Sequence, residues 1–271
     1  GERQRFRLNL TLSQNILAVM VCAILVLGGF VVPVAVLLSY SLVGGDQMLG
    51  RGFAEFALNS VTIAALAAVI ATAISLFLGY VQRGSNTTVI KTAIQVSTLG
   101  YALPGTLLAV GLLGPAGFVD QSLTRLLRSW LGWDGGLILT GTITLLVYAC
   151  VVRFLTVSFN SVSGGFANIS PAMDDAARSL GSKPWLLIRR IHLPLLRPSL
   201  AVAALLVFVD VMRELPATLI LRPFNFETLA TRVYRLASDE RLAEASTAAL
   251  TIVLVGLIPV VLLSRLNSRT E

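Results

Sequence analysis

Three ionisable residues, Asp210, Arg213 and Glu214, stand inside an apolar stretch long enough to cross a lipid bilayer. An ionised side chain without a partner in hydrocarbon is costly, so these residues must face protein or water. Residues three and four apart share one side of a helix, so Asp210 and Arg213 can pair and Glu214 leaves a net negative charge. We expect these charges either to lock helix packing or to line a polar path that favours a cation.

A second group of residues, before these charges in the chain, predicts a helix, a glycine turn and another helix. Ser170-Pro171 is typical of a helix start, and Gly181 is typical of a left-handed helix end. Pro184 begins the second helix. We expect that helix to end at Pro194 and Pro198, because proline lacks a backbone donor and collides with the preceding turn. We call residues 170–194 the knuckle.

The residue patterns of common enzymes are missing from this chain. It contains neither a G-x-x-x-x-G-K-[ST] phosphate loop nor a G-x-S-x-G elbow, and His192 is its only histidine. The two cysteines, Cys22 and Cys150, lie in separate apolar stretches, which argues against a disulfide framework. The sequence therefore predicts no catalytic residue, no metal site and no tightly bound cofactor.

The knuckle contains a motif with fixed spacing. The run Asp174-Asp175-Ala176-Ala177-Arg178-Ser179-Leu180-Gly181, followed ten residues later by Ile191-His192-Leu193-Pro194, resembles the coupling motif of ABC importer permeases, E-A-A, three residues, G, nine residues, I-x-L-P. Asp175 replaces the glutamate, and the other fixed positions match. The resemblance implies that the knuckle faces the cytoplasm and docks in a groove of an ATPase subunit. It assigns ATPase coupling to Asp174, Asp175, Ala176, Ala177, Gly181, Ile191, Leu193 and Pro194.

Two further runs resemble the ferric iron branch of these permeases. They are Tyr101-Ala102-Leu103-Pro104-Gly105-Thr106 and the segment from Met212 to Thr231. The resemblance implies that ferric iron is the transported substrate, delivered by an extracytoplasmic solute-binding protein, and that two ABC ATPase subunits use ATP. Thiamine, phosphonate, sulfate and polyamine permeases share the knuckle, so one of these solutes is the alternative substrate. Residues proposed for the transport path are Asp210, Arg213, Glu214, Pro104 and Gly105.

Permeases of the ferric branch are commonly two six-span halves fused in one polypeptide. The start at Gly1 and the basic residues Arg3, Arg5 and Arg7 fit a linker between such halves. We therefore expect this chain to be a C-terminal half that pairs with a second permease half.

Six stretches are apolar and long enough to position these groups in a membrane. They are residues 16–42, 57–80, 92–113, 136–157, 199–221 and 246–264. The fold predicted is all-α: one six-span domain over 16–264, including a coupling loop at 158–198. Residues 1–15 are expected to be a cytoplasmic segment or linker, and 265–271 a cytoplasmic tail. Within the third stretch, Leu103-Pro104-Gly105 should interrupt the helix.

The composition indicates a membrane protein, since 55% of the 271 residues are hydrophobic and 13% are charged. If the N-terminus is cytoplasmic, thirteen Lys and Arg residues fall on the inside and seven on the outside, with Arg153 counted inside. This asymmetry favours both termini and the knuckle inside. We expect a multi-pass protein of the bacterial inner membrane, in contact with membrane lipid.

Two interpretations from other classes stay open. The knuckle also fits a basic helix-turn-helix that binds DNA, although its apolar flanks favour a membrane protein without a nucleic acid partner. A secondary transporter driven by an ion gradient would use Asp210 and Glu214 as a proton or ion relay.

Overall fold

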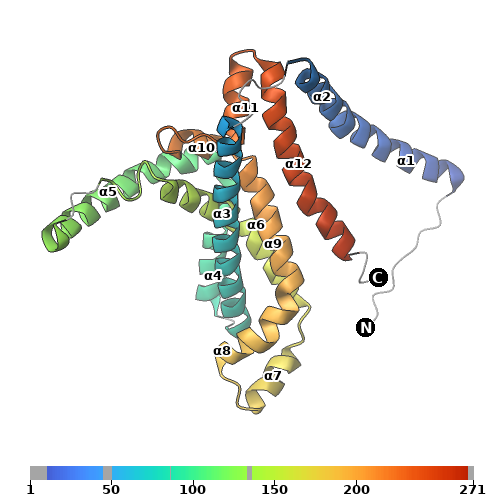
Figure 1. The fold of residues 1–271 in the computed structure, drawn as a ribbon. Helices are drawn as coiled ribbons and strands as arrows, with labels where there is room; N and C mark the ends of the chain where they lie inside the picture. The colour runs from blue at the N-terminus through green and yellow to red at the C-terminus, as the bar shows by residue number, and fades with distance from the viewer. Residues whose placement is uncertain (1–10, 45–50, 86, 133–135, 268–271) are drawn as a thin grey trace.

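The computed structural model describes residues 11–44, 51–85, 87–132 and 136–267. Every regular element in these ranges is a helix, which confirms the predicted all-helical fold (Figure 1). Helices long and apolar enough to cross a membrane are Leu12–Gly44, Gly52–Gly84, Gly105–Trp130, Ile143–Ala167 and Pro184–Met212. A shorter apolar helical stretch, Leu242–Ile258, stands where the sixth span is predicted. The chain is therefore a multi-pass membrane protein, whose described residues supply these five spans and the shorter stretch.

Three helices form the centre of the molecule and lie side by side (Figure 1). They are α3 (Arg51–Gly84), α6 (Ile143–Ala167) and α9 (Leu193–Met212). Small side chains on α3 permit the close approach, since Ala64, Ala67 and Ala71 have no exposed surface. Lipid tails are as apolar as these side chains, so close packing rather than exclusion from water holds the bundle together.

The first spanning helix lies away from this centre. It consists of α1 (Leu12–Val26), the π-helical segment η1 (Leu27–Val31) and α2 (Val32–Gly44). None of its described residues is buried, and α2 packs along α12 (Leu242–Asn267) (Figure 1). The predicted N-terminal segment and C-terminal tail fall mainly on residues 1–10 and 268–271, which lie outside the described residues.

Within the described ranges, two helices contain a π-helical segment, in which the backbone makes a wider turn than an α-helix. η1 precedes α2, and η3 (Ile188–His192) lies between α8 (Pro184–Leu187) and α9. In both cases a proline is the second residue after the π segment: Pro33 follows η1 and Pro194 follows η3. The wider turn displaces the carbonyl that the proline ring would otherwise meet, so the helix continues.

The prediction that the knuckle's second helix ends at Pro194 and Pro198 is therefore wrong. The chain is helical without a break over Pro184–Met212, and it passes Pro198 within α9. The fifth span thus begins inside the knuckle rather than at residue 199. The second helix of the knuckle and the membrane span are a single helix.

The third predicted stretch is interrupted where proline and glycine predict it. It divides into α4 (Thr88–Ser97), the short 3-10 turn η2 (Leu99–Ala102) and α5 (Gly105–Leu131). Pro104 stands directly before α5. α5 then runs away from the central bundle (Figure 1). The single span predicted over 92–113 is therefore two helices, α4 and α5, separated by the 3-10 turn η2 and by the extended residue Leu103.

The fourth span begins later than predicted, at Ile143 instead of residue 136. Thr142 caps α6 by accepting a hydrogen bond from the Thr144 amide at 3.3 Å. Before it, the backbone amides of Ile138, Leu139 and Thr140 donate to the buried carboxylate of Asp120 on α5 at 2.7–3.0 Å. Since a carboxylate satisfies these amides, this segment forms a loop held against α5 rather than a helix.

The fifth predicted stretch, 199–221, is also divided. α9 ends at Met212 and α10 (Pro216–Leu221) follows after three residues. α10 and α11 (Leu229–Ser238) lie at the end of the molecule opposite α7 and α8, and α12 returns from α11 along the bundle (Figure 1). The candidate path residues lie in or beside the breaks before α5 and before α10.

Candidate functional site

The knuckle forms the end of the molecule beyond α3, α6 and α9 (Figure 1). Its first helix, α7 (Pro171–Ser179), starts as predicted: the Ser170 hydroxyl accepts from the Ala172 amide at 3.3 Å, and proline takes the first position. Gly181 has φ 76°, and the Ser182 amide donates to the Ala177 carbonyl at 3.0 Å, which closes the helix end. The predicted helix, glycine turn and second helix are confirmed.

The predicted coupling residues divide between two faces of the knuckle. Asp174 and Ala177 are buried against the bundle, and Ile191 is partly buried. The exposed members are Asp175, Ala176, Gly181, Leu193 and Pro194. Large apolar side chains also point outward, with Leu180 86%, Trp185 69% and Met173 46% exposed. The outward face therefore offers apolar surface at one end of the protein, as a docking site does.

The buried face contains a set of interactions that we call the Asp174 clamp: Arg83, Asp174 and His192. Arg83, in the last turn of α3, donates from Nε to Asp174 Oδ2 at 2.5 Å. Its Nη1 and Nη2 donate to the carbonyls of Phe166 and Ile169, each at 2.9 Å. His192 Nε2 donates to Asp174 Oδ1 at 2.9 Å. The carboxylate thus contacts α3 through one oxygen and η3 through the other.

The clamp sets the ionisation of Asp174. Burial alone would raise the pKa of this carboxyl. Hydrogen bonds from Arg83 and His192, together with their charges, outweigh burial and hold the pKa below its ordinary value. Asp174 is therefore ionised over the physiological range of pH.

At the break between α9 and α10, the predicted pair between Asp210 and Arg213 is confirmed, with Arg213 Nη2 2.5 Å from Asp210 Oδ1. The Arg213 side chain is 66% exposed, whereas that of Asp210 is 14% exposed. A guanidinium at membrane depth is stable only if water or another protein chain surrounds it. The exposed guanidinium of Arg213 therefore needs water, a lipid headgroup or another protein chain beside it.

Glu214 has a partner that the sequence did not indicate. Arg153 Nη1 donates to Glu214 Oε1 at 2.9 Å, and the Ala217 amide donates to the same oxygen at 3.1 Å. Arg153 lies within α6, so counting it as a cytoplasmic loop residue was wrong. The expected net negative charge at Glu214 is also wrong, because the carboxylate is only 6% exposed and is paired.

Gly105 lies against this ion pair. A Cβ atom at this position would stand 2.8 Å from Glu214 Oε1 and would collide with Arg153 Nη1. Glycine permits this approach without displacing the ends of the Arg153 and Glu214 side chains, and the exposed Pro104 precedes it in the extended conformation that starts α5. The break before α5, which was predicted, and the break before α10, which was not, therefore meet at Arg153. Arg153 and Glu214 form one ion pair, and Arg213 and Asp210 form another.

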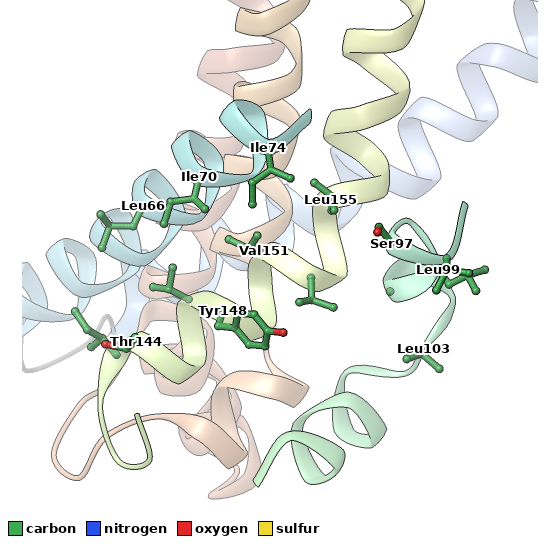
Figure 2. A pocket seen from close by; sticks show the side chains of 15 residues that line it. Leu66, Ile70, Ile74, Ser97, Leu99, Leu103, Thr144, Tyr148, Val151 and Leu155 are labelled. Atoms are coloured by element: carbon green, nitrogen blue, oxygen red, sulfur yellow. The ribbon is translucent and has the colours of Figure 1, made fainter. Parts of the chain in front are cut away.

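A separate apolar cavity lies between α3, η2 and α6, and has a volume of about 880 Å³ (Figure 2). Its walls include Ile70, Leu99, Leu103 and Val151, and the few polar groups include the Tyr148 hydroxyl. No charged side chain lines it among the described residues. It is suited to apolar chains, such as lipid tails or an apolar helix, rather than to an ion.

The alternative of a DNA-binding helix-turn-helix does not fit this arrangement. Its recognition helix would have to enter a groove freely. Here the second helix of the knuckle continues into the membrane span as far as Met212.

The chain is similar to known transport permeases. No family model matches the chain. It is 27% identical over 237 residues to the Fe(3+)-transport system permease protein FbpB 2 of Haemophilus influenzae, an alignment that covers 86% of this chain and 44% of the relative. It is 36% identical over 124 residues to the putative 2-aminoethylphosphonate transport system permease protein PhnV of Salmonella typhimurium, covering 46% of each. The matched regions thus span less than half of each relative.

Among solved structures, the chain resembles a chain of a bacterial alginate ABC transporter, crystallised with a periplasmic protein that holds an alginate pentasaccharide. The TM-score is 0.70, with 17% identity and 94% coverage of both chains. The predicted resemblance to ABC importer permeases is therefore confirmed: the relatives are ferric and other ABC permeases, and the chain has the fold of an ABC transporter permease.

Proposed function

We propose that this chain is the membrane-spanning permease subunit of an ATP-driven ABC importer, and that it moves ferric iron into the bacterial cytoplasm across the inner membrane. The observation that carries this proposal is the knuckle. Its two helices, joined at Gly181, expose large apolar side chains beyond the membrane bundle. Similarity to a ferric permease over 86% of the chain supports iron as the solute.

The energy for transport comes from a partner in this proposal, because the chain lacks a phosphate-binding loop. Two ABC ATPase subunits dock on knuckles, one on this chain and one on a second permease half. ATP binding closes the ATPases, presses on the knuckle and opens the spans toward an extracytoplasmic binding protein. ATP hydrolysis then restores the state that is open to the cytoplasm.

A second solute is supported by two observations. The segment similar to PhnV is 36% identical, a higher identity than that to the ferric permease, although it covers only 46% of the chain. The exposed guanidinium of Arg213 also suits the oxygens of a phosphonate, because its N–H groups form paired hydrogen bonds with such anions. We therefore keep 2-aminoethylphosphonate import as the alternative.

The proposal is tested by purifying the intact gene product from its own membranes in mild detergent and identifying the proteins that accompany it. We expect a P-loop ATPase, retained by the wild type and lost with Gly181→Val. Vesicles holding the complex and its binding protein should take up radioactive ferric iron when ATP is present on the ATPase side. Uptake of labelled 2-aminoethylphosphonate in place of iron would show that the phosphonate, and not ferric iron, is the transported solute. ATP-independent uptake that follows a proton gradient would overturn the assignment in favour of a secondary transporter.

A further inference from the structure

Helix α3 is not adjacent to the knuckle in the chain, because α4, η2, α5 and α6 lie between them in sequence. The knuckle continues α6 through residues 168–170 and continues directly into α9, so motion of the knuckle reaches those two helices through the backbone. The last turn of α3 meets the knuckle through the side chain of Arg83. We propose that Asp174 is a positioning residue for coupling: through Arg83 it makes α3 move as one body with the knuckle, α6 and α9. This inference rests on the proposed function.

The guanidinium of Arg83 fixes both the distance and the angle of this contact. Three of its N–H groups are directed at three different acceptors: the Asp174 carboxylate, the Phe166 carbonyl in the last turn of α6, and the Ile169 carbonyl just beyond it. Guanidinium is planar, so its donors cannot turn independently. One side chain therefore holds the ends of α3 and α6 and the start of the knuckle in a single arrangement.

His192 fixes the other oxygen of the same carboxylate. The ring is 1% exposed and lies between Tyr80 of α3 and Phe166 of α6, at centroid distances of 5.8 and 5.3 Å. Within the described chain, its Nδ1 has no hydrogen bond partner, so the bond to Asp174 is the ring's polar anchor. Because both oxygens are engaged, Asp174 cannot rotate away from α3 without also leaving η3.

The position of Asp174 on α7 makes it suited to transmit force. Met173, Asp175 and Ala176 beside it are exposed, on the face available to an ATPase, while Asp174 and Ala177 point inward. Ala177 offers only a methyl group, which can slide over a neighbour. The ion pair with Arg83 is largely buried, and separating buried opposite charges is strongly unfavourable, so the contact resists sliding.

The test uses the complete transporter in vesicles, with ATP hydrolysis and solute uptake measured together. Asp174→Asn and Arg83→Gln should bind the ATPase normally, while uptake per ATP hydrolysed falls about tenfold, the scale of a typical coupling between sites. The double variant should lose no more than either single variant, because the two residues act through one contact. Lys91→Gln, which removes an exposed cation from α4, is the matched control and should retain wild-type coupling.

A rescue experiment separates coupling from simple folding. His192→Gln keeps an N–H donor for Asp174 and should restore most of the uptake per ATP that His192→Leu loses. If Asp174→Asn fails to accumulate in the membrane, Arg83→Lys replaces it, since lysine keeps the charge but lacks the three-way fork. Loss of coupling in Arg83→Lys supports the proposal, and normal coupling overturns it.

A distance measurement tests the rigid connection itself. With Cys22 and Cys150 replaced by alanine, spin labels at Gln82 on α3 and Ser179 on α7 report their separation by pulsed electron resonance. Wild type should give one distance with and without ATP, and Asp174→Asn should give a broad or ATP-dependent one. An ATP-dependent distance in wild type, or unchanged uptake per ATP in Asp174→Asn, overturns the clamp and leaves the importer assignment standing. Failure of wild type to bind an ATPase overturns the proposed function instead.

Discussion

Arg153 Nη1 donates to Glu214 Oε1 at 2.9 Å, although the two residues stand 61 positions apart. This contact joins the middle of α6 to the break between α9 and α10. Gly105, at the start of α5, lies against the same pair. The continuous helix α6 and the two breaks, before α5 and before α10, therefore come together at one ion pair inside the membrane domain.

Replacing Glu214 by Gln should destabilise the protein, because Arg153 is left with an unpaired charge in a largely buried site. Removing one partner of a buried pair costs about 3–5 kcal/mol. We expect the thermal unfolding temperature of the purified protein in detergent to fall clearly. Asp210→Asn is the control, because its partner Arg213 is mostly exposed and the change should be small. Equal stability of Glu214→Gln and wild type would contradict this account of the pair.

Gly105→Ala should disturb the same contact by its volume. The added methyl group would collide with Arg153, and overpacking of this kind costs about 1–3 kcal/mol. We expect lower transport and lower thermal stability. Gly114→Ala in the same helix meets no atom within 4 Å and should be neutral or slightly stabilising. Indistinguishable behaviour of the two alanine variants would show that the approach of Gly105 is unimportant.

Gly181→Val should impair coupling, because a β-branched residue at φ 76° is strained. Left-handed backbone costs a non-glycine residue about 1–2 kcal/mol. Gly181→Asn should retain most ATP-driven uptake, since asparagine tolerates this conformation. Gly132→Val places the same strain at φ 62° at the end of α5, far from the knuckle, and should leave ATPase binding intact. Loss of ATPase binding in Gly132→Val would refute a local effect at the knuckle.

Stability toward acid should depend on Asp174. The pKa of its carboxyl is below the ordinary value of 3.8 in the folded protein, so the unfolded chain binds its proton first. The stabilising contribution is therefore present above about pH 4 and is lost as the pH falls through the folded pKa. Unfolding in detergent between pH 6 and pH 3 should show this loss in wild type and a weaker dependence in Asp174→Asn. Asp239→Asn, at an exposed position, should behave as wild type.

Features that depend on neighbouring residues could be predicted from the sequence. Ser170, Pro171 and Gly181 define the first helix of the knuckle because capping and left-handed backbone are local requirements. The break at Pro104 and the Asp210–Arg213 pair follow from equally short spacings. Such interactions involve residues within four positions of each other, which the sequence displays directly.

Features that join distant segments could not be predicted. Arg83 lies 91 positions from Asp174, and nothing in the residue types says that they meet. The contact between Arg153 and Glu214 is visible only after α6 and the break that follows α9 are packed together. The lone His192 within the knuckle was the one signal that could have indicated a buried polar contact there.

The two π segments limit which deletions the described helices can accept without rotating their side chains. Each accommodates about one residue more than an α-helix of equal length, and one residue corresponds to about 100° of rotation about the helix axis. Deleting one residue from Leu27–Val31 together with Pro33→Ala would restore a uniform helix, but would turn all of α1 by that angle relative to α2. The same deletion in Ile188–His192 would rotate Trp185 away from its present side of the knuckle. Pro33 and Pro194 each require the π segment before them. That segment in turn fixes the rotation of the preceding helix, and so the direction in which its side chains point.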